Sequence, residues 1–159
     1  MKIRKYREEE CLKLLKLFFD TVRNVNIKDY TQEQVAVWAP DNYIEEKYGC
    51  WSKTLKENFT VIAETDGKIT GFADITPSGY LDRLFVHKDY QGTGIASALL
   101  EKILEYAYEQ NVEKVITEAS ITARPFFEKH NFVVIQEQQV ERSGVFLTNF
   151  LMEEQLFYK

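Results

Sequence analysis

A glycine-containing turn between an apolar strand and a helix constrains this 159-residue chain more than any other feature. Leu84–Val86 is the apolar end of a predicted strand, the turn follows at Gln91–Gly94, and Ile95 begins a predicted amphipathic helix. The first backbone N–H groups of a helix lack intrahelical acceptors and carry about half a positive charge. Glycines let a phosphate approach these groups closely. The segment therefore predicts an anion site, and a diphosphate suits it.

Other phosphate-binding motifs fit this turn less well. A Walker A loop requires Gly-Lys-Ser/Thr after the glycines. A dinucleotide fingerprint requires a third glycine position and an acidic residue about 20 residues further on, after a second strand. Neither pattern follows Gly94. The spacing of the glycines is also compatible with an ordinary strand–turn–helix corner that binds no ligand. The rest of the chain must therefore decide between a phosphate site and such a corner.

The order of predicted elements places the turn inside one α/β domain formed by residues 1–159. A short strand at 3–6 precedes an amphipathic helix at 8–24 and one or two helices over 31–57. Asp66-Gly67 and Ser143-Gly144 each predict a two-residue β-hairpin. An antiparallel run that leads into a β-α-β unit predicts a mixed sheet. The remaining predicted elements are strands at 59–65, 69–76, 80–87, 112–119, 132–142 and 145–153 and helices at 95–110 and 123–130.

Composition and charge exclude several classes of function. The net charge is −5 and the chain has no stripe of Lys and Arg, which argues against nucleic-acid binding. It has no apolar run of 18 residues, so we expect no membrane span. Cys11 and Cys50 cannot form a disulfide framework, and with no signal peptide we expect a cytoplasmic protein. His87 and His130 lack partners at ligand spacing, so we expect no metal site.

The turn resembles the Gln/Arg-x-x-Gly-x-Gly/Ala signature of the GNAT superfamily, the acetyl-CoA-dependent N-acetyltransferases. The segment from Ser120 to Phe132 resembles the family's second cofactor motif, Asn-x-x-Ala-x-x-x-Tyr-x-Lys-x-Gly-Phe, and Leu84–Val86 resembles its fourth strand. The order of elements also agrees from residue 2 to the end. The resemblance implies a GNAT-like α/β fold. Its mixed, mostly antiparallel sheet would have about seven strands, with a central β-α-β unit and flanking helices.

The resemblance also implies acetyl-CoA as co-substrate. Backbone amides from Gln91 to Ala96 would hold its pyrophosphate, and the pantetheine arm would fill a gap between the fourth and fifth strands. A backbone amide near Leu84–Val86 would polarise the thioester carbonyl, as in an oxyanion hole. The implied cofactor-binding residues are Leu84, Phe85, Val86, Gln91, Gly92, Thr93, Gly94, Ile95, Ala96, Ser120 and Phe127.

Three residues depart from the family pattern. Ser120 replaces an asparagine, and Asn131 replaces a glycine at a position where asparagine also suits a left-handed cap. Phe127 stands where the family has the tyrosine that acts as general acid. General acid catalysis contributes typically about 10² to 10⁴ in rate, but an alkyl thiol with a pKa near 8.5 leaves tolerably without it. The residues that stay open as replacement acids are Tyr90, Ser120, Thr122 and His87.

Removal of a proton from the acceptor amine is the larger chemical problem. Deprotonation of an amine with a pKa of about 10.4 costs about 4.6 kcal/mol of free energy at pH 7. Several family members use a glutamate on the fourth strand, and its position falls near Tyr80. Asp82 lies two residues after Tyr80, and in a regular strand both side chains face the same side. Asp82 is therefore our candidate general base. Asp74 and Glu64 are rivals, and a simple ion pair of Asp82 with Arg83 is the structural alternative.

The leading hypothesis is direct acetyl transfer to an amine-bearing small molecule. An excess of six acidic side chains over residues 58–159 favours a cationic acceptor, although an amino acid or a protein amine stays open. The acceptor would enter between the helices of residues 8–57 and the hairpin at Ser143-Gly144. The alternative is a non-catalytic acetyl-CoA sensor, which Phe127 favours. A homodimer through the C-terminal strands also stays open. Five rings would form either core or substrate wall: Tyr30, Trp38, Tyr43, Tyr48 and Trp51.

Overall fold

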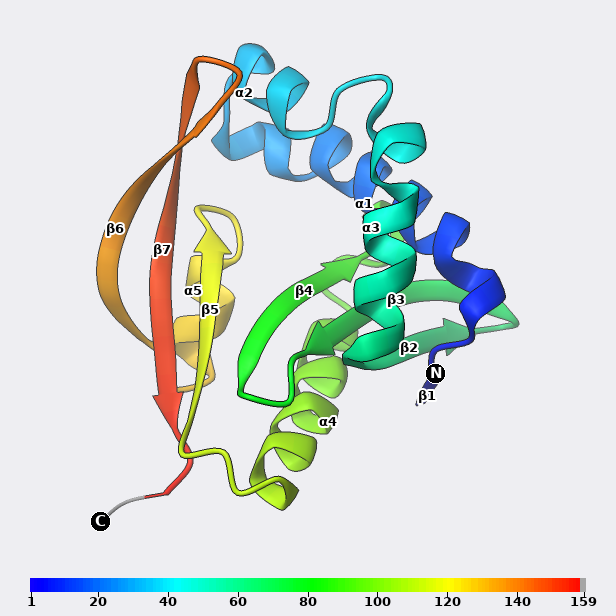
Figure 1. The fold of residues 1–159 in the computed structure, drawn as a ribbon, viewed down its shortest axis with the longest axis vertical. Coiled ribbons are helices and arrows are strands. Elements are labelled where there is room, and N and C mark those ends of the chain that lie inside the picture. Colours follow the sequence, from blue (N-terminus) through cyan, green and yellow to red (C-terminus); the bar gives the residue numbers. More distant parts are fainter. Residues whose placement is uncertain (158–159) are drawn as a thin grey trace.

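A seven-stranded mixed sheet forms the centre of the molecule, with the strand order β1-β2-β3-β4-β5-β7-β6 (Figure 1). The computed structural model describes residues 1–157. All neighbouring strands are antiparallel except β4 and β5, which are parallel. The predicted fold class is therefore confirmed. The strands are β1 Lys2–Lys5, β2 Phe59–Thr65, β3 Lys68–Ile75, β4 Tyr80–Val86, β5 Lys114–Ser120, β6 Val133–Arg142 and β7 Val145–Gln155.

Five α-helices flank the sheet: α1 Cys11–Asn24, α2 Gln32–Trp38, α3 Tyr43–Glu57, α4 Ile95–Glu109 and α5 Arg124–Lys129. The helix predicted at 8–24 begins with a 3-10 turn at 8–10, and its α-helical part starts at Cys11. The region 31–57 forms two helices separated around Pro40. Thr31 and Gln34 form the predicted capping box, since each side chain accepts a hydrogen bond from the other residue's backbone N–H. Within residues 1–157, no helix is both long enough and apolar enough to cross a bilayer.

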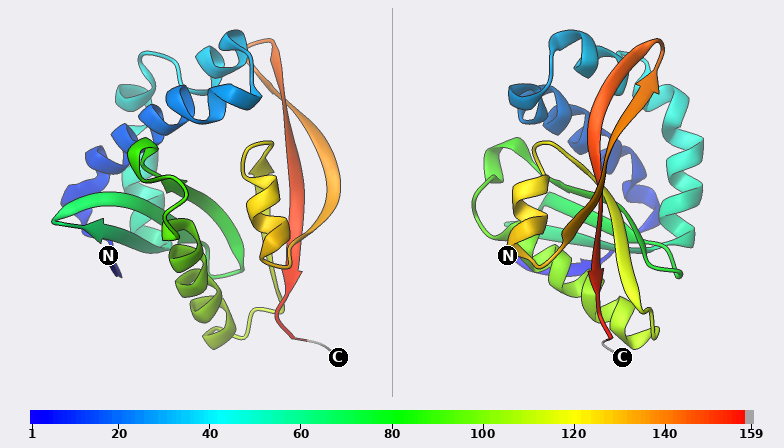
Figure 2. Two further views of the ribbon diagram at one scale, coloured as in Figure 1. Left: turned by 180° about the vertical axis from the view of Figure 1, so that it is seen from behind. Right: turned by 90° about the vertical axis from the view of Figure 1, so that its left-hand side faces the viewer.

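The helices cover both faces of the sheet and create two hydrophobic cores (Figures 1 and 2). Helix α4 packs on β2, β3 and β4 through its apolar stripe, which includes Leu99, Leu100 and Ile103. Helices α1 and α3 pack on the opposite face, where Leu14 and Phe18 are buried. The periodic apolar stripes of these helices are thus buried as the sequence predicts.

The two predicted β-hairpins form, and the second builds a wall beside the N-terminal helices. Asp66 and Gly67 have φ values of 51° and 77°, and Ser143 and Gly144 have 49° and 81°. Two successive positive φ values are the signature of a type I′ turn. The β6–β7 hairpin reaches α2, where the Gln34 side chain donates a hydrogen bond to the Phe146 carbonyl at 2.8 Å (Figure 2).

The sheet divides between β4 and β5. These strands pair at only two positions, Tyr80 with Ile116 and Leu81 with Thr117, and then diverge (Figure 1). In addition, β4 is not a regular strand. Ile75 of β3 lies opposite Leu81 while Asp74 lies opposite Arg83, so Asp82 is an extra residue in a β-bulge. The edge of β4 that faces β5 therefore lacks a strand partner beyond Leu81.

Candidate active site

The predicted anion site has the backbone geometry that its sequence implies. Gly92 and Gly94 have φ values of 71° and 85°, in the left-handed region that favours glycine, and Gly94 caps α4. The turn is held by two side chains: Gln91 Nε2 donates to the Val86 carbonyl at 2.7 Å, and Thr93 Oγ1 donates to the Tyr90 carbonyl at 2.6 Å. Within residues 1–157, no protein oxygen accepts a hydrogen bond from the backbone N–H groups of residues 92–97. These donors are available to an anion.

A cleft of about 440 Å³ runs from this turn into the gap between β4 and β5. We call it the β4–β5 cleft. It is lined by every residue that the family resemblance implies for cofactor binding, from β4 (Leu84, Phe85, Val86), the turn and start of α4 (Gln91, Gly92, Thr93, Gly94, Ile95, Ala96), and the β5–α5 region (Ser120, Phe127). The structure therefore gathers three separate segments of the sequence around one elongated space.

A second cavity, of about 370 Å³, lies between the N-terminal helices and the β6–β7 hairpin. We call it the aromatic cavity, because seven aromatic rings line it: Phe18, Tyr30, Trp38, Tyr43, Trp51, Tyr80 and Phe85. Four of the five rings left open by the sequence belong to this set, whereas Tyr48 is exposed elsewhere. Tyr30 and Trp51 are also nearly buried, so these rings form core and cavity wall at once.

The two cavities meet where β4 and β5 diverge. Five residues line both of them: Trp38, Asp82, Phe85, Glu118 and Ser120. A group that ends in the β4–β5 cleft and a molecule held in the aromatic cavity would therefore meet beside two carboxylates. That is the arrangement required for direct transfer between two bound molecules.

Asp82 lies at this junction with one-third of its side chain exposed. Its Oδ2 is 3.6 Å from Arg83 Nη2, so the ion pair considered from sequence is present at long range. Tyr80 and Asp82 both line the aromatic cavity, as expected, although the bulge makes the strand between them irregular. Asp82 thus has both access to the cavity and a fixed positive neighbour.

Arg83 is held mainly by a different carboxylate, that of Asp74. Arg83 Nη1 lies 2.5 Å from Asp74 Oδ2, Nη2 donates to Thr54 Oγ1 at 2.7 Å, and the guanidinium stacks over the Trp51 ring at 4.5 Å. Asn58 donates to the same Asp74 oxygen at 2.9 Å. Burial raises the pKa of Asp74 to about 6, and the Arg83 charge opposes that rise. Of this cluster, Arg83 and Trp51 line the aromatic cavity, and Asp74 lies buried behind them.

Neither rival base lies at the junction. Asp74 is fully buried, and Glu64 pairs with Arg4 at 3.2 Å on the β1–β2 side of the sheet. Among the described residues, the carboxylates that line the cavities are Asp82 and Glu118 only.

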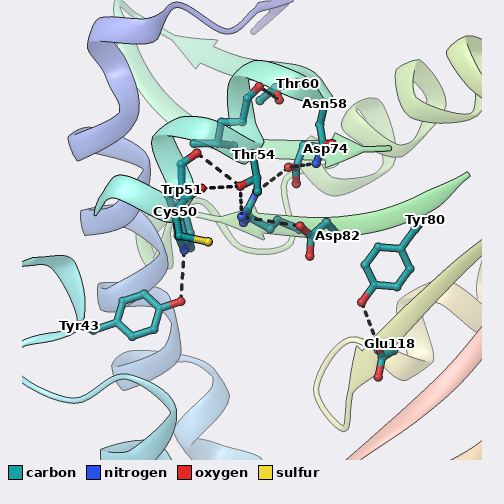
Figure 3. Close-up of polar contacts among 12 residues, drawn as sticks. Tyr43, Cys50, Trp51, Thr54, Asn58, Thr60, Asp74, Tyr80, Asp82 and Glu118 are labelled. Atoms are coloured by element: carbon teal, nitrogen blue, oxygen red, sulfur yellow. Dashed lines mark hydrogen bonds and ion pairs between the residues drawn. The ribbon is translucent and has the colours of Figure 1, made fainter. Parts of the chain in front are cut away.

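Glu118 is a site residue that sequence reasoning missed. Its Oε1 accepts a hydrogen bond from the Tyr80 hydroxyl at 2.8 Å, and its Oε2 accepts one from Gln138 Nε2 at 3.0 Å. Figure 3 shows Tyr80 pointing towards Glu118 across the gap between β4 and β5. Burial, reinforced by this carboxylate, raises the pKa of the Tyr80 phenol above its usual range. The only sequence signal was the position of Glu118 near the end of the predicted fifth strand, two residues before Ser120.

Phe127 places an apolar ring in the β4–β5 cleft. It is buried, with ring contacts to Phe126 and Phe132 at 5.3 and 5.0 Å. Three of the residues considered as replacement acids, Tyr90, Ser120 and Thr122, line the same cleft, whereas His87 does not. The Thr122 hydroxyl is buried and has no hydrogen-bond partner within residues 1–157, so it is free to bond a bound molecule.

The two cysteines lie in different surroundings: Cys11 is buried and Cys50 is exposed. Both lie far along the chain from the cofactor motifs, yet Cys50 lines the aromatic cavity. Neither Cys11 nor Cys50 lines the β4–β5 cleft.

Comparison with known proteins identifies the family. A family model described as an acetyltransferase (GNAT) domain matches residues 26–154. The chain belongs to the GNAT acetyltransferase family. The predicted resemblance, and with it the expected enzyme class, is therefore confirmed.

Individual relatives agree with this assignment. The chain is 32% identical over 152 residues to the uncharacterized N-acetyltransferase YafP of Escherichia coli K12, an alignment that covers 96% of this chain and 94% of that protein. A GCN5-related N-acetyltransferase structure from Rhodopseudomonas palustris matches with a TM-score of 0.90 at 26% identity, covering 98% and 95% of the two chains. The fold also matches that of the PaiA N-acetyltransferase from Thermoplasma acidophilum, solved with coenzyme A. There the TM-score is 0.73 at 20% identity, with 97% and 98% coverage.

Proposed function

We propose that this GNAT protein transfers the acetyl group of acetyl-CoA directly to the amine of a small molecule held in the aromatic cavity. The observation that carries the proposal is the junction of the two cavities at Asp82, Glu118 and Ser120. One cavity begins at unpaired helix N–H groups and the other is walled by aromatic rings, so the junction is where donor and acceptor would react.

The β4–β5 cleft supports acetyl-CoA as the donor. Its unpaired N–H groups suit a pyrophosphate, and the free edge of β4 offers backbone groups to the amide-containing pantetheine arm. The Thermoplasma acidophilum neighbour of the same fold was crystallised with coenzyme A, which also supports this donor. The absence of a cysteine from the cleft-lining residues described here favours direct transfer over an acyl-enzyme.

In the proposed step, the neutral amine nitrogen attacks the thioester carbonyl carbon. A backbone amide on the β4 edge would polarise the carbonyl oxygen. The carbon–sulfur bond then breaks, and coenzyme A leaves as a thiolate, because Phe127 cannot donate a proton. The Asp82 carboxylate accepts the proton that the bound ammonium loses before the attack. The second proton, which the nitrogen loses after the attack, passes through solvent to the released thiolate. Asp82 and Glu118 make this end of the cavity negative, which supports the sequence-based expectation of an acceptor that is cationic at its reacting end.

The sensor hypothesis keeps one specific observation in its favour, the buried Phe127 ring at the position of the expected acid. It differs from the transferase in one measurable property, since a sensor binds acetyl-CoA without amine-dependent turnover. A homodimer through the unpaired outer edge of β6 also stays a prediction.

The deciding experiment measures free-thiol release from acetyl-CoA by the purified protein with pooled small amines, beside calorimetric binding of acetyl-CoA. We expect tight binding and release above the background without amine. Binding without release from any amine would support the sensor instead. A protein that neither binds acetyl-CoA nor releases thiol would contradict both hypotheses.

A further inference from the structure

The aromatic cavity carries positive side chains at the end away from the β4–β5 cleft. Tyr43 and Lys47 lie one turn apart on α3 and both line the cavity. Arg142, the last residue of β6, lines the same cavity from the hairpin. Burial raises the pKa of the Tyr43 phenol, and the hydrogen bond with Trp51 and the charges of Arg83 and Arg142 oppose that rise. Lys47 and Arg142 do not line the β4–β5 cleft.

These two cations differ from the other charged groups of the cavity because they lack protein partners. Within residues 1–157, neither Lys47 nor Arg142 forms an ion pair or a side-chain hydrogen bond. Arg83, by contrast, is fully engaged by Asp74, Thr54 and the Trp51 ring. Two unpaired cations beside apolar rings are a place where an anionic group of a ligand would gain charge-assisted hydrogen bonds.

The opposite end of the cavity is negative. Asp82 and Glu118 both belong to the junction where the acetyl group would be presented. Aromatic rings also line the cavity, and its volume of about 370 Å³ suits a small molecule. Carboxylates thus line the cavity at its junction with the β4–β5 cleft, and unpaired cations line it outside that junction; we call this arrangement the charge order.

We propose that the acceptor is an amine whose other end carries an anionic group such as a carboxylate, separated from the amine by an aromatic or apolar spacer. Lys47 and Arg142 are then specificity-determining residues that bind the anionic group. The inference rests on the proposed function and narrows its acceptor: the reacting end is cationic, but a purely cationic molecule such as a polyamine is rejected, because its second charge would meet Lys47 and Arg142.

Three probes of one shape test this charge order. They are 4-(aminomethyl)benzoate, its neutral amide 4-(aminomethyl)benzamide, and the dication 1,4-bis(aminomethyl)benzene. We expect kcat/KM to be about tenfold higher for the acid than for the amide, the effect of two partly exposed ion pairs, and lowest for the dication. The preference should shrink at about 0.5 M salt. Binding is measured separately by fluorescence, since Trp38 and Trp51 line the cavity.

Variants assign the preference to the two residues. In the double variant Lys47→Gln, Arg142→Gln, the ratio of acid to amide should fall to near one. Lys47→Glu should shift the preference towards the dication. Lys53→Gln is the matched control, because Lys53 is exposed on the same helix but lines neither cavity. It should leave the ratio as in the wild type.

The two readouts separate this inference from the proposed function. If the acid binds about tenfold more tightly than the amide but no amine releases thiol, Lys47 and Arg142 stand as an anion-binding site of the cavity and the transferase proposal fails. If thiol is released but acid and amide agree within about twofold, or the dication is preferred, the inference is overturned and the transferase stands. Failure of the acid to bind at all also overturns the inference.

Discussion

A substitution at Phe127 can measure how much a proton donor contributes to the proposed reaction. The ring fills the cleft where a hydroxyl is expected, and a thiolate whose conjugate acid has a pKa near 8.5 leaves without help near neutral pH. We expect Phe127→Tyr to change kcat by less than about tenfold. The measurement is steady-state thiol release. A gain of about 10² or more would mean that the wild-type site lacks an acid it needs, as the sensor hypothesis requires.

Asp82 and Glu118 differ in what surrounds them, and that difference predicts which accepts the proton. Both Glu118 oxygens accept hydrogen bonds, from Tyr80 and Gln138. Within residues 1–157, by contrast, Asp82 has a 3.6 Å contact with Arg83 and no side-chain hydrogen bond. We expect Asp82→Asn to lower kcat about 100-fold at pH 7 and to recover towards pH 10, where solution supplies neutral amine.

Glu118→Gln is the matched control for that variant, because it also removes one carboxylate from the junction. We expect it to act mainly on KM, with less than about a tenfold loss of kcat. A larger loss in Glu118→Gln, rescued by high pH, would transfer the role of base to Glu118.

Asp74, the buried partner of the cavity residue Arg83, makes stability depend on pH. Burial raises its pKa from 3.8 to about 6 in the folded chain. Between these values the folded protein holds a proton that the unfolded chain has lost. The contribution of Asp74 to stability is therefore complete below about pH 4 and falls as pH rises through about 6, by about 3 kcal/mol.

Comparison with Asp74→Asn isolates this effect, because the substitution removes the titrating group and leaves the other carboxylates in place. The free energy of unfolding is measured by urea at several pH values. The difference between wild type and variant should decline from pH 4 to pH 7. A difference that stays constant or grows would contradict the raised pKa.

The start of α4 is the element on which donor binding depends most. Gly94 has a φ of 85°, open space beside it and unpaired N–H groups around it. We expect Gly94→Asp to weaken acetyl-CoA binding at least about 100-fold, since the new carboxylate faces the pyrophosphate. Gly67→Asp is the control: Gly67 has a φ of 77° and equally open space but lies in the β2–β3 hairpin. Calorimetry should find its affinity close to wild type. Equal losses in both variants would mean that backbone strain, and not the anion site, is responsible.

The sequence predicts elements well where local chemistry determines them. Asp66-Gly67 specifies its hairpin by positive φ values, and Thr31 with Gln34 specifies the start of α2 by a capping box. The β-bulge at Asp82 has no local signal, because it is defined only by the register of β4 against β3. The same holds for the divergence of β4 and β5.

The candidate site, at the scale of the whole molecule, also combines features that have a local sequence signal with features that only the fold defines. Most residues that line the glycine turn and the β5–α5 side of the β4–β5 cleft could be predicted, because two motifs of the sequence carry them. The aromatic cavity is assembled from α1, α2, α3, β4, β5, β6 and β7, and no motif spans those segments. Glu118, Cys50 and Arg142 therefore became site residues only when the fold brought them together.

The division of the sheet predicts how the whole molecule responds to its donor. β1–β4 and β5–β7 share only two paired positions, and the proposed acetyl-CoA site has walls from both sides of the gap. A ligand that binds only the folded chain stabilises it by about 2.7 kcal/mol at 100 times its Kd, which for a domain of this size raises Tm by about 8 °C. Hydrogen exchange should slow on both sides of the gap, in β4 and the start of α4 and also in β5. Protection confined to the α4 side would mean that the ligand binds the glycine turn without entering the gap, and the proposed meeting of donor and acceptor at Asp82 would fail with it.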